Sequence, residues 1–357
     1  MPNTIIIGSG SYLPERKING DYFLETEFYT ESGEKITDKP TAEIIEKFVD
    51  ITEIKERRYI NDDQSNSQIG YEAAKRAIED AKIDPESLDY IIYASNFGDV
   101  KTNGVLDFMP SMSTKVKHLL GIKNRKCKNY DMIFGCPGWV EGMILADNLI
   151  KAKVARNILV IGAETLSRVT DPYDRNKMIF ADGAAAVVVQ ATEEENVGII
   201  THNTICDNGE EINYLINSHS LKKDEDRGKL YIRMQGRKIY QYALNNVPDA
   251  IKQTIDDANL SIEDIDKILI HQANAKMDHA IINRLMKLYG IKEYDDSIAP
   301  MTIQEFGNSS VATVPTMFDL IRKGKMEGHS FQSKGNIIFT SVGAGMNINA
   351  IIYKFNV

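Results

Sequence analysis

The chain has 357 residues, 43% of them hydrophobic and 26% charged, and a formal net charge of −9. This is the composition of a globular protein with a large core, and the acidic balance argues against a surface that grips nucleic acid. The N-terminal sequence lacks a signal-peptide pattern, and no apolar run is long enough to span a membrane. The three cysteines form no CxxC pair, which suits a reducing compartment. We therefore expect a cytoplasmic protein that binds neither nucleic acid nor membrane.

Apolar strands alternate with amphipathic helices along the chain. Strands are predicted at residues 5–7, 90–94, 157–161, 184–189, 267–270, 336–340 and 350–355, and helices at residues 69–81, 137–153, 239–258, 275–289 and 311–323. This alternation predicts an α/β protein with mostly parallel sheets. Two polar segments rich in turn-forming residues, 26–40 and 217–229, are predicted to be surface insertions.

A pattern from the first half of the chain returns in the second half. The segment AIEDAKIDPESLDYIIY (77–93) matches TIDDANLSIEDIDKILI (254–270) in the order helix, turn and strand. Further along, Phe-Gly-Cys at 134–136 aligns with Phe-Gly-Asn at 306–308, and the helices and strands that follow also correspond. Several matches in the same order indicate an internal duplication.

The duplication predicts two halves, residues 1–190 and residues 191–357. Duplicated α/β halves usually pack about a pseudo-two-fold axis, and sheets of this type place ligands at the ends of their strands. Because Cys136 and Asn308 occupy equivalent positions, we expect them to lie close together near the centre of the molecule.

Cys136 lies between a glycine and a proline at the predicted start of a helix. Proline suits the first helical position, so the sulfur would lie at a helix N-terminus, where the dipole favours a thiolate. A thiolate is a good nucleophile near neutral pH. The alternative is a small, inert residue in a crowded turn, because free cysteine is usually buried. The cysteine alone leaves both interpretations open.

Other polar residues and glycines follow predicted strands. His271 ends the strand in DKILIHQAN and is either a core histidine or part of a site, and Asn308 could simply cap its helix. The sequence SVGAGMN (341–347) follows a strand and is either a tight turn or a source of amide donors for an oxyanion.

The segment 8–10 lacks the third glycine of a dinucleotide-binding loop, and no cluster of cysteine and histidine residues has the spacing of a zinc site. We expect no dinucleotide cofactor and no metal.

Over nearly its whole length the sequence resembles the β-ketoacyl-acyl carrier protein synthase III family of the thiolase superfamily. The motifs that carry the resemblance are SYLPERKI near the start, IKERRYI (54–60), MPSMSTKVKHLLGIKN (109–124), GCPG (135–138), DPYDR (171–175), FADGAAAVVV (180–189), IRMQGRKIY (232–240), HQAN (271–274), GNSSVATVP (307–315) and SVGAG (341–345). The resemblance implies a thiolase fold, duplicated and five-layered (α-β-α-β-α) with two mixed, mostly parallel-stranded sheets. It also implies a homodimer.

The resemblance implies a catalytic triad of Cys136, His271 and Asn308 and an acyltransferase that performs a decarboxylative Claisen condensation in the initiation of fatty acid biosynthesis. Cys136 would take an acyl group from acyl-CoA, and an enolate from malonyl-acyl carrier protein would attack it. His271 and Asn308 would stabilise the enolate. The oxyanion would be held by N–H groups of Cys136 and of the turn Gly343-Ala344-Gly345. No cofactor is required, because the coenzyme A thioester is a substrate.

The resemblance also assigns substrate contacts. Arg175 matches a contact to the coenzyme A phosphates, Asn274 matches a contact to the pantetheine arm, and Lys276 stands where an arginine often docks the acyl carrier protein. Met109 replaces a phenylalanine that closes the acyl pocket across the dimer, and methionine is adaptable in shape. Trp139, one helical turn beyond the nucleophile, is the neighbour expected to influence the choice of acyl donor.

One family feature is missing. Lys47 and Ile51 stand where the family has a tryptophan and an arginine that sandwich the adenine of coenzyme A. A longer, branched or carrier-bound acyl donor therefore stays open. The alternatives are a related ketosynthase of an alkylresorcinol, polyketide or olefin pathway, and a catalytically inactive acyl-binding protein of the same fold.

Overall fold

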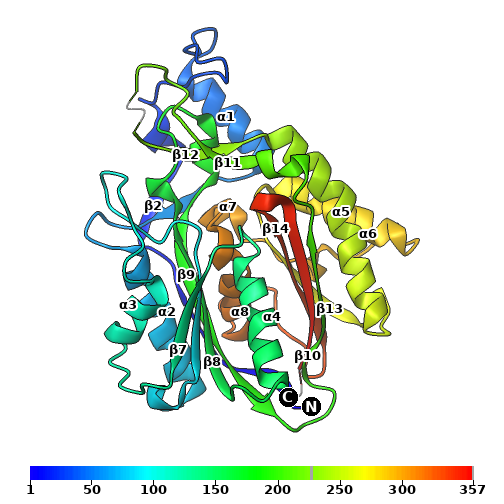
Figure 1. Cartoon of the computed structure of the whole chain (residues 1–357). Coiled ribbons are helices and arrows are strands. Elements are labelled where there is room, and N and C mark those ends of the chain that lie inside the picture. Colours follow the sequence, from blue (N-terminus) through cyan, green and yellow to red (C-terminus); the bar gives the residue numbers. More distant parts are fainter. Residues whose placement is uncertain (226–227, 356–357) are drawn as a thin grey trace.

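The computed structural model describes residues 1–225 and 228–355, so the predicted 217–229 insertion is described except for residues 226–227. Two mixed sheets alternate with three layers of helices, and the five layers are seen nearly edge-on in Figure 1. This arrangement confirms the predicted α-β-α-β-α order. None of the helices among the described residues is long and apolar enough to cross a membrane.

The first sheet is built from the first half of the chain. Its strand order is β1 (Asn3–Tyr12), β9 (Asp182–Thr192), β8 (Asn157–Thr165), β4 (Tyr90–Ala94) and β7 (Lys128–Met132). Only β9 runs against the other strands. The central strands are continuous apolar runs because both faces of the sheet are covered by helices.

The second sheet repeats this topology in the second half of the chain. Its order is β10 (Gly198–Cys206), β15 (Asn347–Lys354), β14 (Asn336–Gly343) and β13 (Ile265–Ile270), and here only β15 runs against the others. Strand by strand, this order reproduces β1-β9-β8-β4. The matching topology is what the internal duplication predicts.

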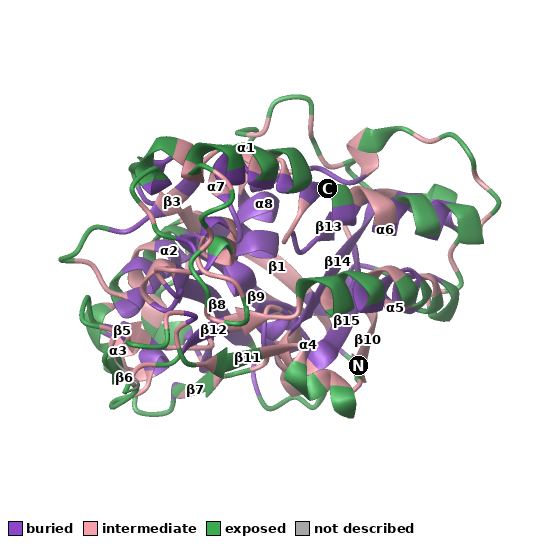
Figure 2. Ribbon diagram, turned by 90° about the horizontal axis from the view of Figure 1, so that it is seen from above, coloured by how far each residue is buried: buried purple, intermediate pink, exposed green. Residues whose placement is uncertain are grey.

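Eight α-helices lie in the described part of the chain: α1 (Thr41–Thr52), α2 (Asn66–Ala81), α3 (Met112–Leu119), α4 (Gly138–Lys151), α5 (Gly236–Asp257), α6 (Ala275–Leu288), α7 (Ile303–Phe306) and α8 (Thr313–Arg322). Helices α4 and α8 form the central layer between the sheets, α2 and α3 cover the outer face of the first sheet, and α5 and α6 cover the outer face of the second (Figure 1). The outer helices are exposed on one face, whereas α8 is buried almost throughout (Figure 2).

Among the described residues, three two-stranded sheets lie outside the two main sheets: β2 (Arg16–Ile18) with β3 (Arg57–Tyr59), β5 (Asp99–Val100) with β6 (Leu106–Asp107), and β11 (Leu215–Ser218) with β12 (Tyr231–Met234). The sequence pattern did not predict them, nor did it predict α1, α3, α7, β7 and β10. Strands β7 and β10 are edge strands that lack a continuous apolar run, because the residues of β7 are exposed or half buried and most residues of β10 are half buried.

Candidate active site

The site lies where the two halves meet. Cys136 is in the turn between β7 and α4, Asn308 is in the equivalent turn before α8, and His271 directly follows β13. Asn308 forms a β-bridge with Phe180 of the first half. The structure thus brings the first-half nucleophile candidate and the second-half asparagine to one junction, as the duplication predicts.

Ser310 connects all three triad candidates. Its backbone N–H donates to Asn308 Oδ1 at 2.7 Å. Its hydroxyl hydrogen-bonds the sulfur of Cys136, and its backbone hydrogen-bonds the ring of His271. Ser310 adopts a left-handed conformation with φ 54°, which is uncommon for a residue other than glycine and is often found at functional sites.

A cavity of about 310 Å³ opens beside the sulfur. Cys136, Ser310, Ala344 and Gly345 contribute to its lining, and most of its wall is apolar, including Phe97, Ile133, Phe134, Leu166, Phe180 and Ile232. An apolar cavity with a few polar groups at one point is the usual form of a small-molecule site. The arrangement is able to accommodate an acyl chain with its reacting carbonyl at Cys136.

Two glycines allow the turns around the cysteine to touch. A Cβ atom on Gly343 would lie 2.5 Å from the backbone nitrogen of Cys136, and a Cβ atom on Gly135 would lie 2.7 Å from the backbone nitrogen of Ala344. Gly135 also has a φ of 69°, which favours glycine. The two turns therefore pack backbone against backbone, which places amide groups beside the sulfur.

The thiol of Cys136 is not activated in the way the sequence predicts. Burial raises its pKa to about 11, the hydrogen bond from Ser310 acts in the opposite direction, and the nearby carboxyl group of Glu164 raises the pKa further. Burial therefore favours the neutral thiol, which is the opposite of what the helix N-terminus alone favours. The proton must leave as the sulfur attacks.

His271 and Asn308 are arranged as neutral groups. Burial lowers the pKa of His271 to about 4, so the imidazole carries no charge at neutral pH. Because Asn308 Oδ1 accepts the N–H of Ser310, its NH₂ group is the end left to donate to another molecule. A neutral imidazole and an amide donor can polarise a carbonyl oxygen in a site that water does not fill.

Three predicted substrate contacts lie outside the cavity wall. Arg175 begins an exposed helical turn in DPYDR, and Lys276 is exposed in the first turn of α6. The Asn274 side chain caps α6 by accepting the N–H of Met277 at 3.1 Å. The substrate contacts of these three residues stay predictions.

Both insertions attach to the segment that carries Arg175. The N–H of Tyr29 donates to the carbonyl of Tyr173 at 3.0 Å, and their rings meet edge to face. From the second insertion, the N–H of Leu221 donates to Asp171 at 2.6 Å. The insertions therefore form part of the surface next to the predicted coenzyme A contact.

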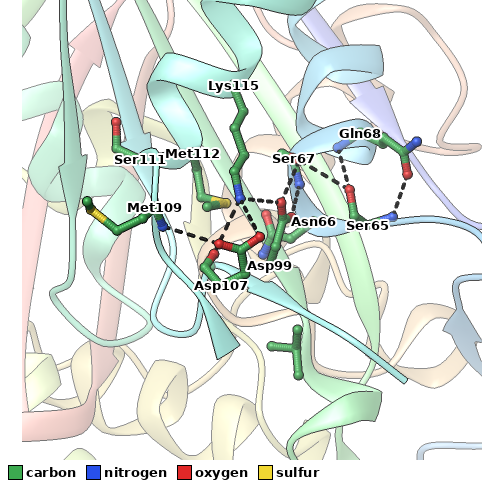
Figure 3. Close-up of polar contacts among 12 residues, drawn as sticks. Ser65, Asn66, Ser67, Gln68, Asp99, Asp107, Met109, Ser111, Met112 and Lys115 are labelled. Carbon is green, nitrogen blue, oxygen red and sulfur yellow. Dashed lines mark hydrogen bonds and ion pairs between the residues drawn. The ribbon is translucent and has the colours of Figure 1, made fainter. Parts of the chain in front are cut away.

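Met109 is 86% exposed and does not line the cavity of its own subunit. It lies on a loop that is fastened to the helical layer, because Lys115 Nζ binds Asp99 at 2.9 Å and Asp107 at 3.3 Å (Figure 3). Ser67 at the start of α2 also donates to Asp99. The loop thus presents Met109 outward, and its predicted place in the pocket of a partner subunit stays a prediction.

Trp139 is not a wall of the site, so this expectation is wrong. Its side chain is fully buried and meets Phe339 of β14 edge to face at a ring distance of 5.6 Å. Helix α4 is enclosed by a sheet on each side, and the residue one turn beyond the cysteine faces the second sheet. Trp139 packs the core rather than selecting the acyl donor.

The structure adds three residues that the sequence did not single out. Ser310 belongs to the recognised GNSS motif but its contacts are visible only in the fold. Asn96, after β4, accepts the N–H of Gly135 at 2.9 Å, and Glu164, at the end of β8, accepts the N–H of Asn96 at 2.5 Å. A pair of polar residues, Ser95 and Asn96, directly after a buried strand was the only local signal for Asn96.

Comparison with known proteins agrees with this geometry. Residues 130–208 match the family described as 3-oxoacyl-[acyl-carrier-protein (ACP)] synthase III, and residues 255–355 match its C-terminal part. Over 355 residues the chain is 32% identical to the β-ketoacyl-[acyl-carrier-protein] synthase III of Staphylococcus aureus (strain JH1), with 99% of each chain covered.

Solved structures share the fold. The crystal structure of 3-oxoacyl-[acyl-carrier-protein] synthase III from Aquifex aeolicus VF5 has a TM-score of 0.78 at 28% identity and covers 99% of this chain and 100% of its own. The priming β-ketosynthase of the R1128 polyketide pathway has a TM-score of 0.79 at 24% identity and covers 99% and 96%. With these full-length likenesses, the chain belongs to the β-ketoacyl-[acyl-carrier-protein] synthase III family, whose members are condensing enzymes of the thiolase superfamily.

Proposed function

We propose that this protein is a 3-oxoacyl-acyl carrier protein synthase III that initiates fatty acid synthesis. The observation that carries the proposal is that Ser310 contacts Cys136, His271 and Asn308, and that Ser310 and Cys136 line an apolar cavity. A sulfur nucleophile suits a thioester substrate, and neutral donors suit a carbonyl that must be polarised but not hydrolysed. The coenzyme A thioester is a substrate, and the reaction uses no cofactor.

In the first half-reaction the acyl group moves to the cysteine. The sulfur of Cys136 attacks the acyl carbonyl of acyl-CoA and gives up its proton, and coenzyme A leaves as a thiol. The backbone amides of Cys136 and of the turn Gly343-Ala344-Gly345 hold the oxyanion. Their close packing supports this role, because preorganised amides cost no rearrangement during the reaction.

In the second half-reaction malonyl-acyl carrier protein loses CO₂ and forms an enolate. The imidazole of His271 and the free NH₂ of Asn308 hydrogen-bond the enolate oxygen. The enolate carbon attacks the acyl-cysteine, the new carbon–carbon bond forms, and the sulfur leaves and regains a proton. The product is a 3-oxoacyl group on the carrier protein.

The protein acts as a homodimer that forms along β7. This strand is the free edge of the first sheet, and large exposed apolar residues surround it: Val105, Leu106, Phe108, Met109, Leu119, Tyr130 and Ile133. Exposed apolar clusters of this kind mark interaction surfaces. Ile133 also lines the cavity, so a partner seated on this face is close enough to complete the cavity with its Met109.

Acyl-CoA and acyl carrier protein reach the site from the surface that carries Arg175 and Lys276. Because Arg175 is exposed next to both insertions and Lys276 begins α6, both cations are available to phosphate or to an acidic partner. The three free cysteines are consistent with work in the reducing cytoplasm.

A second candidate is a priming ketosynthase of another pathway that takes a different acyl donor. This candidate is favoured because the two side chains that enclose the adenine ring of coenzyme A in the family are absent. Lys47 and Ile51 stand at those positions, both exposed on α1, and neither is aromatic. The acyl donor decides between the two functions.

The test is intact-mass measurement after incubation with a panel of acyl-CoAs and acyl-acyl carrier proteins. We expect an acyl adduct that is absent in Cys136→Ala, followed by its discharge on addition of malonyl-acyl carrier protein. The donor that loads fastest identifies the function. Absence of an adduct with every donor would overturn the nucleophile assignment and support an acyl-binding protein instead.

A further inference from the structure

Asn96 contacts both turns of the active site. It follows β4 and lines the cavity. Its side-chain oxygen accepts the N–H of Gly135, the residue before the nucleophile, at 2.9 Å. Its side-chain nitrogen donates to the hydroxyl oxygen of Ser310 at 3.3 Å. The same amide group therefore joins the cysteine turn of the first half to the asparagine turn of the second.

The direction of these bonds determines what the Ser310 hydroxyl can do. An amide oxygen accepts and an amide nitrogen donates, so the bond from Gly135 forces the Asn96 nitrogen to face Ser310. The Ser310 oxygen then accepts, and its own proton remains available for the sulfur of Cys136, to which it donates. Asn96 thereby orients the hydroxyl of Ser310. Among the described contacts of the Cys136 sulfur, this is the only hydroxyl that stabilises the thiolate.

Glu164 holds Asn96 in this position. The carboxyl group is fully buried at the end of β8, accepts the N–H of Asn96 at 2.5 Å and accepts the hydroxyl of Ser95 at 3.4 Å. Burial raises the pKa of Glu164 to about 8, so the group is largely protonated at neutral pH. When it ionises, its charge opposes thiolate formation at Cys136.

We propose that Asn96 is a positioning residue for the nucleophile, held by Glu164, which sets the reactivity of Cys136 by directing the hydroxyl of Ser310 to the sulfur. This inference deepens the proposed function, because it rests on Cys136 as the nucleophile. It does not depend on which acyl donor or extender the enzyme uses.

The test measures the rate at which iodoacetamide alkylates Cys136 between pH 7 and 10, followed at that peptide by mass spectrometry. In Asn96→Ala we expect a rate at pH 8 about tenfold below that of the parent, the size expected for one hydrogen bond to a charged group. Asn96→Asp keeps the acceptor for Gly135 and loses the donor to Ser310. Because it also adds a carboxyl group that opposes the thiolate, we expect it to be at least as slow as Asn96→Ala, and the double variant with Ser310→Ala described next distinguishes positioning of the hydroxyl from bracing of the Gly135 turn.

Two further variants separate positioning from damage to the fold. In a Ser310→Ala background, Asn96→Ala should have no additional effect, since both changes remove the same hydrogen bond to sulfur. Glu164→Gln keeps an acceptor for Asn96 without the charge, so we expect it to match the parent at pH 7 and to alkylate several-fold faster at pH 9. Asn283→Ala, an exposed asparagine of α6 away from the cavity, is the control that keeps the parent rate.

Parent-like alkylation in both Asn96 variants, or effects of Asn96→Ala and Ser310→Ala that multiply, would overturn the inference. Melting temperatures of all variants show whether a slow rate reflects unfolding. Because alkylation needs no acyl substrate, this outcome is independent of the proposed function: the Asn96 effect is measurable even if no acyl donor loads Cys136.

Discussion

At the residue scale, two opposing effects act on Cys136, and their sizes decide the protonation state. A helix N-terminus stabilises a nearby anion by about 0.3–1 kcal/mol, up to roughly 2 kcal/mol in partly buried sites. Burial can shift a pKa by several units, each worth about 1.4 kcal/mol. Burial raises the pKa of Cys136 to about 11, the direction expected if burial is the larger effect.

The contact between Gly343 and Cys136 gives a prediction for a single residue. Gly343→Ala places a methyl group 2.5 Å from the backbone nitrogen of Cys136, so the two turns must separate and the oxyanion donors move. We expect a loss of about a hundredfold in the rate of acyl transfer, the cost of a misplaced donor. Acyl loading measured by mass spectrometry reports the change. Gly236→Ala, at the start of α5 with nothing within 4 Å of the added methyl, should load at the parent rate.

At the element scale, the duplication reaches beyond topology into side-chain contacts. Each central helix buries one aspartate: Thr4 of β1 donates to Asp147 of α4 at 2.7 Å, and Ser9 of β1 donates to Asp319 of α8 at 2.8 Å. Each aspartate is also paired with a lysine four residues later in its helix. The central layer is thus tied to the same strand twice, which fixes the relative position of the two helices that begin at the active site.

Helix α6 contains a buried carboxyl group that is not paired with a lysine among the described residues. Asp278 is fully buried, and burial raises its pKa well above the usual value, whereas the backbone groups of Asn274 and Ala273 act weakly in the opposite direction. The unfolded chain releases this proton near pH 4, whereas the folded chain keeps it, so Asp278 reduces stability progressively as the pH rises above 4.

Asp278→Asn removes this dependence. We expect the variant to melt at a higher temperature than the parent at pH 8 and the difference to shrink as the pH falls towards 4, measured by thermal unfolding in a pH series. Asp257→Asn, an exposed aspartate at the end of α5, serves as the matched control and should follow the parent at every pH. A constant difference across the series would contradict the assignment of a buried, protonated carboxyl group.

At the scale of the whole molecule, the two halves are alike in topology but differ at their edges. The first sheet has an additional edge strand, β7, with exposed apolar residues on and beside it, among them Tyr130 and Ile133. The loop that carries Met109 projects on the same side, near β5, β6, α3 and β7 in Figure 2. This asymmetry gives the molecule one face suited to a second copy.

A charge on this face should separate the subunits. We expect Tyr130→Glu to elute as a monomer in size-exclusion chromatography with light scattering, because a glutamate at the centre of an apolar interface is buried without a partner. Leu288→Glu, at the end of α6 and similarly exposed, should keep the parent's oligomeric state. If the parent itself is a monomer, the proposed dimer and the role of Met109 across it are wrong.

Much of this architecture was readable from the chain. The strand Tyr90–Ala94 matches its prediction residue for residue, because a fully buried strand is a continuous apolar run. Edge strands β7 and β10 were missed because few of their residues are fully buried, so neither strand is a continuous apolar run. Trp139 was misassigned because spacing along a helix says which residues share a face but not which face meets a cavity.

By itself, the sequence determined the duplicated α/β frame, the equivalent positions of Cys136 and Asn308 and the family, because these depend on local patterns and their spacing. Only the tertiary structure decided how the site is held and charged. Asn96 and Ser310 are 214 residues apart and meet through one hydrogen bond. Likewise, the protonated thiol of Cys136 and the neutral ring of His271 result from burial, which depends on which distant segments exclude water from a residue.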